Sequence, residues 1–233
     1  MLAGLNAHQQ NAPPQSREPA ISRYLDITGW KRREHFELFR GMEQPFFSIT
    51  VEVDATGLRG HCSGQDRPSF FLTALHLLLH AANDVEAFRL RIRGDRVWLH
   101  DRVDLTSTIL REDDTFAFGH FPFLERFADF EEHGRAELER VKKPGPLWVP
   151  ENNDGLIYHS TLPWFRFTAF TNAMDGAADS IPRVVFGRCS RNGDRWVMPV
   201  AVEVHHALVD GLDVANFLQR FQHNLDSIPE ESS

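Results

Sequence analysis

Segments with helical spacing of apolar residues alternate along this chain with segments in which apolar and polar residues alternate one by one. Residues 45–53, PFFSITVEV, place Phe47, Ile49 and Val51 on one side and polar residues on the other, as in a strand buried on one face. Because strands outnumber helices but alternate with them, we predict an α/β fold with helices packed on a largely β core. Helices are expected over residues 30–40, 68–83, 123–141 and 212–225, and further strands over residues 88–93, 96–100, 104–118, 155–170, 183–190 and 195–204.

Turn and cap residues set the ends of several of these elements. Gly94-Asp95 and Asn192-Gly193 separate pairs of strand-like segments and predict tight hairpins, because such residues accept the positive φ that these turns require. We expect Gly41 to end the first helix and Ser69 to lie near the start of the second. Gly134 is expected to weaken the middle of the third helix.

The length of the chain leaves the number of domains open, and the lack of an internal boundary favours one. At about 150 residues per domain, 233 residues leave a choice between one large domain and two small ones. No repeat, low-complexity linker or shift in charge marks a boundary, so we expect a single domain over residues 21–227. Residues 1–20 are polar, contain prolines and lack the features of a secretory signal, so we expect them to form a flexible arm, with a flexible tail over residues 228–233.

The charge balance and the cysteines exclude several classes of protein. The 25 basic and 33 acidic residues give a net charge of −8, which opposes general binding to nucleic acid or to an anionic membrane. The most apolar run, residues 70–82, is interrupted by polar residues and falls short of the roughly 20 needed to cross a bilayer. Cys62 and Cys189 belong to no metal-binding motif and suggest no disulfide scaffold, so we expect a cytoplasmic protein.

His76 and His80 lie four positions apart in the helix expected over residues 68–83. That spacing allows two imidazoles to bind one metal ion. However, no glutamate follows His76 as in the HExxH pattern of metalloproteases. We therefore expect two histidines at the edge of the core and no metal site.

The pattern richest in chemistry is residues 199–221, PVAVEVHHALVDGLDVANFLQRF. On a strand, His206 continues the more apolar row of side chains, whereas His205 faces the other way. His206 would then lie at the rim of the core, open to a ligand, where an imidazole suits a general base near neutral pH. Asp210, followed by Gly211, could orient His206 as in a Ser-His-Asp triad or bind a remote arginine, and the spacing leaves both roles open.

The segment HHALVDG resembles the HHxxxDG motif of the chloramphenicol acetyltransferase family, the trimeric type. WKRREHFELFRGMEQPFFSITVEVD, STLPWFRFTAF and NGDRWVMPVAVEVHHALVDGLDVANFL look like the corresponding segments of that family in order and spacing, and span residues 24–226. The motif alone also occurs in condensation domains, and dihydrolipoyl and plant acyltransferases carry relatives of it. The resemblance implies an α/β two-layer sandwich of a large mixed β-sheet with packed helices, and a homotrimer with active sites at subunit interfaces.

The resemblance also implies direct acetyl transfer from acetyl-CoA to a hydroxyl of a small acceptor, chloramphenicol or a similar compound, with a role in antibiotic resistance. Acetyl-CoA would be a co-substrate, with no tightly bound cofactor. On this resemblance His206 removes the hydroxyl proton, and Ser160 matches the donor to the oxyanion, a contribution of about 3 kcal/mol. Arg188 matches a basic position that would bind the coenzyme, with Lys142 and Lys143 as weaker candidates.

Arg32 in WKRREHF matches the arginine that pairs with the motif aspartate in that family. The resemblance therefore implies a structural ion pair between Arg32 and Asp210, which would fix the turn that carries His206. Asp213 is expected to favour the N-terminus of the following helix. His205 is expected to pack or bond locally, without a catalytic role.

Three departures from the family concern the acceptor. Val185 stands where the family has a threonine that holds a water near the reacting centre, and Leu38 and Phe39 replace the usual Phe-Tyr pair. Residues 116–154 match poorly. Acceptor pockets are built from such positions, so the chemistry transfers to this chain better than the identity of the acceptor does.

Two alternatives remain. An acyltransferase of the same fold could use another acceptor or a carrier-bound acyl donor, although Ala207 replaces the arginine usual in the lipoyl type and a condensation domain needs about twice this length. The second alternative is a catalytically impaired relative that binds a small apolar ligand. Val185 motivates this second alternative, because it removes a hydroxyl from the site.

Overall fold

The computed structural model describes residues 22–147, 149 and 153–228. In chain order its elements are β1 (Arg23–Tyr24), α1 (Arg33–Phe39), β2 (Phe46–Asp54), α2 (Thr56–His61), α3 (Phe70–Asp84), the 3₁₀ helix η1 (Glu86–Arg89), β3 (Leu90–Arg93), β4 (Arg96–Leu99), β5 (Asp104–Leu110), β6 (Phe116–Phe121), α4 (Phe127–Lys142), β7 (Leu156–Leu162), β8 (Arg183–Gly187), β9 (Ser190–Asn192), β10 (Arg195–His205) and α5 (Gly211–Asp226).

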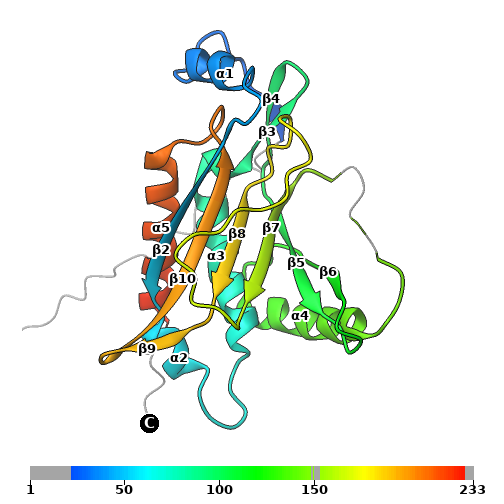
Figure 1. Ribbon diagram of the computed structural model, residues 1–233, viewed down its shortest axis with the longest axis vertical. Coiled ribbons are helices and arrows are strands. Elements are labelled where there is room, and N and C mark those ends of the chain that lie inside the picture. The colour runs from blue at the N-terminus through cyan, green and yellow to red at the C-terminus, as the bar shows by residue number, and fades with distance from the viewer. Residues whose placement is uncertain (1–21, 148, 150–152, 229–233) are drawn as a thin grey trace, which may run out of the picture.

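One large sheet dominates the structure. Its seven strands include the path β2-β10-β8-β7-β5-β6, with β9 pairing to β10. β5, β7 and β8 are parallel, and the other pairings are antiparallel, so the sheet is mixed. The helices α3 and α5 lie together behind this sheet (Figure 1). The predicted α/β two-layer sandwich is confirmed, with a smaller sheet β1-β4-β3 beside it.

The core lies between the sheet and the helices. Val184 and Phe186 of β8 and the apolar row of β10 point into it and are buried. Phe186 stacks on Phe221 of α5, with 5.6 Å between ring centroids and 9° between planes. Burying one such side chain contributes roughly 1.5–3 kcal/mol. Because successive strand residues face opposite sides, Val185 and Glu203 belong to the other face of the sheet, which we call the outer face.

An irregular segment, residues 163–182, crosses the outer face between β7 and β8 (Figure 1, yellow). The Ser48 hydroxyl donates to the Phe170 carbonyl at 3.0 Å, and both the backbone and side-chain amides of Asn172 donate to one oxygen of Glu203 at 2.7 Å. The predicted strand over residues 155–170 is therefore wrong beyond Leu162. Pro163 has no N–H to continue the ladder, and the chain turns there to cover the sheet.

Three of the predicted turn and cap residues, Gly94, Gly193 and Ser69, are confirmed. Gly94 and Gly193 adopt φ of 65° and 62° in the two hairpins, and the Ser69 hydroxyl accepts the Leu72 N–H at the start of α3. Gly41 directly follows Arg40, the C-cap of α1, so the helix ends where predicted, but among the described glycines Gly41 does not adopt the positive φ of a glycine cap. The predicted strand over residues 183–190 ends at Gly187, and Ser190 begins β9.

Gly134 has a packing role in α4. It is buried against α3, and a Cβ atom placed there would lie 2.6 Å from Cδ2 of the fully buried Leu72. The glycine thus allows α3 and α4 to approach closely, which offsets its low helix propensity.

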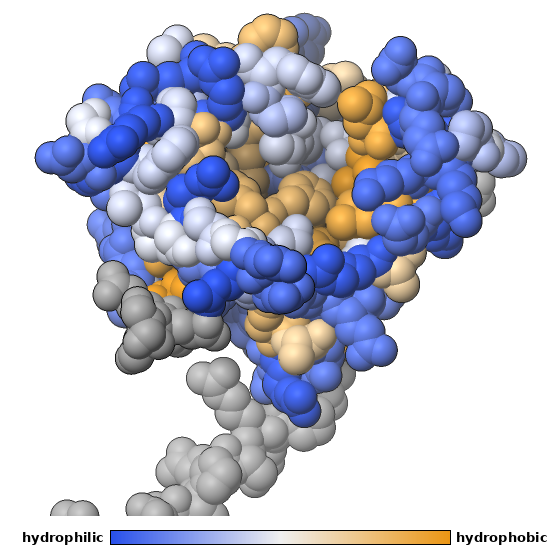
Figure 2. Space-filling view, turned by 90° about the horizontal axis from the view of Figure 1, so that it is seen from below, coloured by the Kyte–Doolittle hydropathy of each residue, from blue (hydrophilic) through white to orange (hydrophobic). Residues whose placement is uncertain are grey.

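Several sequence predictions fall wholly or partly outside the described residues. The expected arm over residues 1–20 and all of the expected tail except Ile228 lie outside them, as do positions 148 and 150–152 of the loop after α4. Within the described ranges, no helix is both long and apolar enough to span a membrane. Seen from its lower end, the molecule is hollowed, with hydrophobic residues inside a hydrophilic rim (Figure 2).

Candidate active site

His206 immediately follows the last residue of β10. Its backbone N–H donates to the Pro45 carbonyl at 2.7 Å, which ties it to the start of β2. The chain then turns, and the N–H groups of Leu208 and Val209 both donate to the His205 carbonyl, at 3.0 and 3.1 Å. The result is a partly exposed histidine fixed at one end of the longest strand of the sheet.

The imidazole of His206 is held by one hydrogen bond and two aromatic rings. Its Nδ1 lies 3.2 Å from the Val209 carbonyl oxygen, which can only accept. Nδ1 therefore carries the proton of the neutral ring, and Nε2 keeps a free lone pair. Phe39 stacks on the ring at 4.0 Å and 19°, and Phe47 packs at 4.7 Å and 57°. This arrangement presents Nε2 as a proton acceptor.

His205 differs from His206 in its burial and in its hydrogen bonds. It is 2% exposed, its Nε2–H donates to the Ala177 carbonyl at 2.9 Å, and its Nδ1 accepts the Ala207 N–H at 3.1 Å. Burial lowers the pKa of His205. Because both ring nitrogens are hydrogen-bonded, the His205 side chain links β10 to the segment of residues 163–182 that crosses the outer face.

Arg32 and Asp210 form an ion pair beside this turn. The same guanidinium lies 3.6 Å from Asp213 and donates to the His206 carbonyl at 3.4 Å. Burial alone would raise the pKa of Asp210, but the Asp213 N–H and the Arg32 side chain outweigh it and lower that pKa. Within the described part of the chain Asp210 makes no hydrogen bond to the His206 ring, so the geometry favours the arginine partner over the triad arrangement.

Asp210 also caps α5. Its carboxylate accepts the N–H groups of Leu212 and Asp213 at 2.9 and 3.2 Å, and the Asp213 carboxylate accepts the Asp210 N–H at 3.0 Å. This reciprocal capping box satisfies backbone donors that the first helical turn leaves free. Asp213 thus does more than favour the helix N-terminus, because it closes the loop that carries His206.

Ser160 lies on β7, on the outer face of the sheet. Its hydroxyl accepts a hydrogen bond from the Thr108 hydroxyl of β5 at 2.9 Å. It lines a cavity of about 360 Å³ whose walls include Phe116, Phe118, Val149, Thr108, Tyr158 and Asn172. The cavity combines aromatic walls with a few polar groups, which suits a small, partly apolar molecule.

His206 and Ser160 of one chain do not meet. Ser160 pairs with Val185 of β8, and Val185 pairs with Ala201 of β10, so Ser160 lies two strands from Ala201. His206 follows Ala201 by five positions. At about 3.3 Å per residue and 4.8 Å per strand, the backbone positions of the two residues are roughly 19 Å apart. One carbonyl group therefore cannot contact both residues of a single chain.

The remaining predicted residues are dispersed. Val185 is 1% exposed beside Ser160 and is not among the described residues that line the cavity. Arg188 is exposed just after β8, and its N–H donates to the Phe165 carbonyl at 2.7 Å. Lys142 and Lys143, at the end of α4, are exposed as well.

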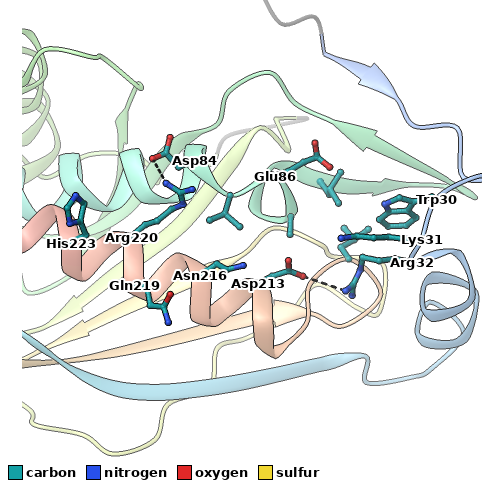
Figure 3. Close-up of a pocket in the computed structure, with 14 residues that line it drawn as sticks. Trp30, Lys31, Arg32, Asp84, Glu86, Asp213, Asn216, Gln219, Arg220 and His223 are labelled. Carbon is teal, nitrogen blue, oxygen red and sulfur yellow. Dashed lines mark hydrogen bonds and ion pairs between the residues drawn. The ribbon is translucent and has the colours of Figure 1, made fainter.

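A second cavity, of about 550 Å³, lies between α5, the residues that precede α1 and the turn at η1 (Figure 3). Arg32 and Asp213 reach it from one end, and Arg220 pairs with Asp84 at 3.3 Å at the other. Its lining includes neither Ser160 nor His206 among the described residues. It therefore adds no reacting group to the site.

His76 and His80 contact each other, with 3.2 Å between their Nε2 atoms, and His76 also donates to the Leu124 carbonyl at 3.0 Å. Burial, with His80 nearby, lowers the pKa of His76 to about 4. In the part of the chain that the structure describes, no three His, Cys, Asp or Glu side chains gather in a way that could hold a metal ion.

Sequence reasoning missed two groups at the site. The Val209 carbonyl sets the His206 tautomer, and Thr108 contacts Ser160. A backbone carbonyl leaves no sequence signal. The polar Thr106 and Thr108, which alternate with core residues in β5, could have indicated a polar outer face, but not the strand beside it.

Comparisons with known proteins identify relatives of this chain. The family model for chloramphenicol acetyltransferase matches residues 22–222. Chloramphenicol acetyltransferase 3 of Escherichia coli is 30% identical over 204 residues, covering 85% of this chain and 94% of that protein, and chloramphenicol acetyltransferase 2 of the same organism is 30% identical over 210 residues, covering 88% and 97%.

Solved structures show the same relationship. A chloramphenicol acetyltransferase structure superimposes with a TM-score of 0.82 at 32% identity, covering 88% of this chain and all of that one. A probable dihydrolipoamide acetyltransferase from Listeria monocytogenes, 16% identical with a TM-score of 0.68 and coverage of 94% and 98%, shares the fold. The match over residues 22–222 and the identity to the Escherichia coli proteins show that this chain belongs to the chloramphenicol acetyltransferase family, a family of acyltransferases.

Proposed function

We propose that this protein transfers an acetyl group from acetyl-CoA to a hydroxyl of a small acceptor, chloramphenicol or a similar compound. The family membership supports the reaction class, and relatives named chloramphenicol acetyltransferase support the acceptor. In this proposal acetyl-CoA is a co-substrate, and no metal or tightly bound cofactor takes part. The protein acts in the cytoplasm and contributes to antibiotic resistance.

His206 is the general base of the proposed reaction. Its Nε2 takes the proton of the acceptor hydroxyl as the oxygen forms a bond to the thioester carbonyl carbon. The negative charge then lies on the former carbonyl oxygen, and the Ser160 hydroxyl donates to it. As the intermediate collapses, the C–S bond breaks, and the imidazolium of His206 returns the proton to the thiolate of CoA. The free Nε2 lone pair supports this assignment.

The separation of His206 and Ser160 carries the proposal for the assembly. Because roughly 19 Å divide them within one chain, a neighbouring copy supplies the second group at a subunit interface. The resemblance to the trimeric type of the family supports a homotrimer as the active enzyme. The region around His206 and the region around Ser160 both expose apolar side chains that such an interface would bury. Leu38 near His206 is 59% exposed, and Phe116 at the Ser160 cavity is 50% exposed.

Arg32 and Asp210 support the site without touching the substrates. Their ion pair fixes the turn that carries His206. Arg188, which is exposed immediately after β8, the strand that pairs with the Ser160 strand β7, is the proposed contact for the anionic coenzyme. Its positive charge would attract that ligand locally, whereas the net charge of −8 on the whole chain repels it.

The proposal is tested by CoA release, followed with a thiol reagent. Purified protein with acetyl-CoA should release CoA only when chloramphenicol or another hydroxylated antibiotic or metabolite is added. His206→Ala should abolish release and leave the fold unchanged, whereas His205→Gln should retain it if folded. Tight binding of chloramphenicol without turnover would favour the impaired ligand-binding alternative, and full activity of His206→Ala would refute the base assignment.

A further inference from the structure

We propose that Thr108 is a positioning residue that orients the Ser160 hydroxyl toward the oxyanion, an inference that rests on the proposed function. The two residues lie side by side on neighbouring parallel strands, one position beyond the paired residues Ser107 and His159. The Thr108 hydroxyl lies 2.9 Å from the Ser160 hydroxyl and donates to it. Both side chains face the 360 Å³ cavity.

The proposed role of Ser160 requires Thr108 to be the donor in this hydrogen bond, whose two oxygens lie 2.9 Å apart. A serine hydroxyl has a single proton. If Ser160 gave that proton to Thr108, its lone pairs would face the developing negative charge. With Thr108 as the donor, the Ser160 oxygen is already an acceptor on one side, and its own proton is free to point into the cavity. Such a chain of two hydroxyls also polarises the second donor and strengthens it.

The surroundings of Ser160 make Thr108 its orienting partner. Val185 is its neighbour on the other flanking strand, and the Val185 side chain has no polar atom. Thr106, the next residue along the outer face of β5, already donates to the Gly119 carbonyl at 3.0 Å. Thr108 is also β-branched, so its side chain has little rotational freedom on a strand and holds its oxygen in place. Among the described residues, Thr108 provides the one hydrogen bond to the Ser160 side chain.

This geometry predicts an effect on the chemical step. Thr108→Val keeps the shape of the side chain and removes the hydroxyl, so kcat should fall about three- to tenfold, as expected for one lost hydrogen bond. The KM for the acceptor should change little, because the bond acts on a charge that forms after binding. Thr108→Ser should restore kcat, since it restores the donor.

A double-mutant cycle tests the proposal. The variants Thr108→Val, Ser160→Ala and the double variant are compared by kcat and by the free energy of unfolding in urea. Thr108→Val should have less than a twofold effect in the Ser160→Ala background, because the partner is already absent. Equal losses of kcat in both backgrounds, or a loss confined to KM, would overturn it. Where Thr108→Val fails to fold, Thr108→Ala takes its place in the cycle.

The outcomes separate this inference from the proposed function. If the wild-type protein releases no CoA with any acceptor, the proposed function fails and this inference fails with it. If the wild type is active and Ser160→Ala is impaired, but the two substitutions do not couple in kcat, only the role of Thr108 fails. Coupling in the unfolding free energy without coupling in kcat would make the hydrogen bond structural and would likewise overturn the inference.

Discussion

Arg32 and Asp210 form an ion pair between residues 178 positions apart, at the point where α5 begins and the His206 turn ends. The guanidinium is largely buried, with 12% of its side chain exposed, whereas the aspartate side chain is 40% exposed. One contact thus ties the segment before α1 to the loop that presents the proposed base.

Asp210→Asn should weaken the ion pair with Arg32 while keeping a side chain that caps α5. We expect a loss of about 1–2 kcal/mol in unfolding free energy, below the roughly 3–5 kcal/mol of a fully buried pair, because solvent screens the exposed aspartate. Asp210→Ala should cost about 1 kcal/mol more, since it also removes the N-cap. Urea unfolding measures both. Arg33→Ala, at an exposed i,i+4 pair with Glu37, is the control and should cost less than about 0.5 kcal/mol. Equal costs at Arg33 and Asp210 would contradict the role of the ion pair.

Phe39→Leu should slow the reaction. The phenyl ring stacks on the His206 imidazole at 4.0 Å, and an aromatic pair of this kind contributes about 0.5–1.5 kcal/mol, so kcat should fall about two- to tenfold. Phe39→Tyr keeps the ring and should retain kcat. Steady-state kinetics with melting curves distinguish the two variants. An unchanged kcat in a folded Phe39→Leu protein would show that the stack does not position the base.

Stability should fall in mildly acidic solution. His76 has a folded-state pKa of about 4, against about 6.5 when unfolded, so its contribution is complete above pH 6.5 and is lost as the pH falls toward 4. This difference corresponds to about 3 kcal/mol at pH 4. His159, whose pKa burial lowers to about 3, acts in the same direction, so a variant is needed to isolate His76.

His76→Gln provides that comparison, because its amide can still donate to the Leu124 carbonyl. Urea unfolding at pH 7, 6, 5 and 4 should give a flatter profile for the variant than for the wild type. Parallel profiles would mean that His76 titrates normally in the folded protein.

Two glycine substitutions should have opposite signs. Gly134→Ala places a methyl group 2.6 Å from Cδ2 of buried Leu72, and the cost of overpacking, about 1–3 kcal/mol, should exceed the gain in helix propensity of about 1 kcal/mol. Gly60→Ala in α2 meets open space and should stabilise the protein by about 0.5–1 kcal/mol. Thermal melting of the two variants checks both signs. Stabilisation by Gly134→Ala would show that α3 and α4 can move apart at little cost.

Local patterns predicted much of the fold. Period-two hydrophobicity predicted β2, the Ser69 cap predicted the start of α3, and Gly94 and Gly193 predicted the hairpins, because each depends on a few consecutive residues. The segment over residues 163–182 was not predicted correctly, since its path depends on distant partners such as Glu203. The close approach that requires Gly134 is also a tertiary property.

The candidate site, like the fold, was predicted from the sequence only in part. The HHxxxDG motif and its neighbouring segments indicated His206, Ser160, Asp210 and Arg32. The pairing of Thr108 with Ser160 depends on the register of two parallel strands 52 positions apart, and the tautomer of His206 depends on a backbone carbonyl. Neither leaves a signal in a single sequence.

Mixed assemblies of the proposed trimer test the central claim, that the reaction needs His206 and Ser160 from different chains. Co-expressed His206→Ala and Ser160→Ala chains should assemble at random, and a site is intact when its histidine comes from the Ser160→Ala chain and its serine from the His206→Ala chain. Each condition has a probability of one half, so about one quarter of wild-type activity should be recovered. Separately purified variants mixed without subunit exchange are the control and should show only their own residual activities. Recovery to about one quarter is the predicted result, and mixed trimers no more active than the sum of the two variants would contradict the account.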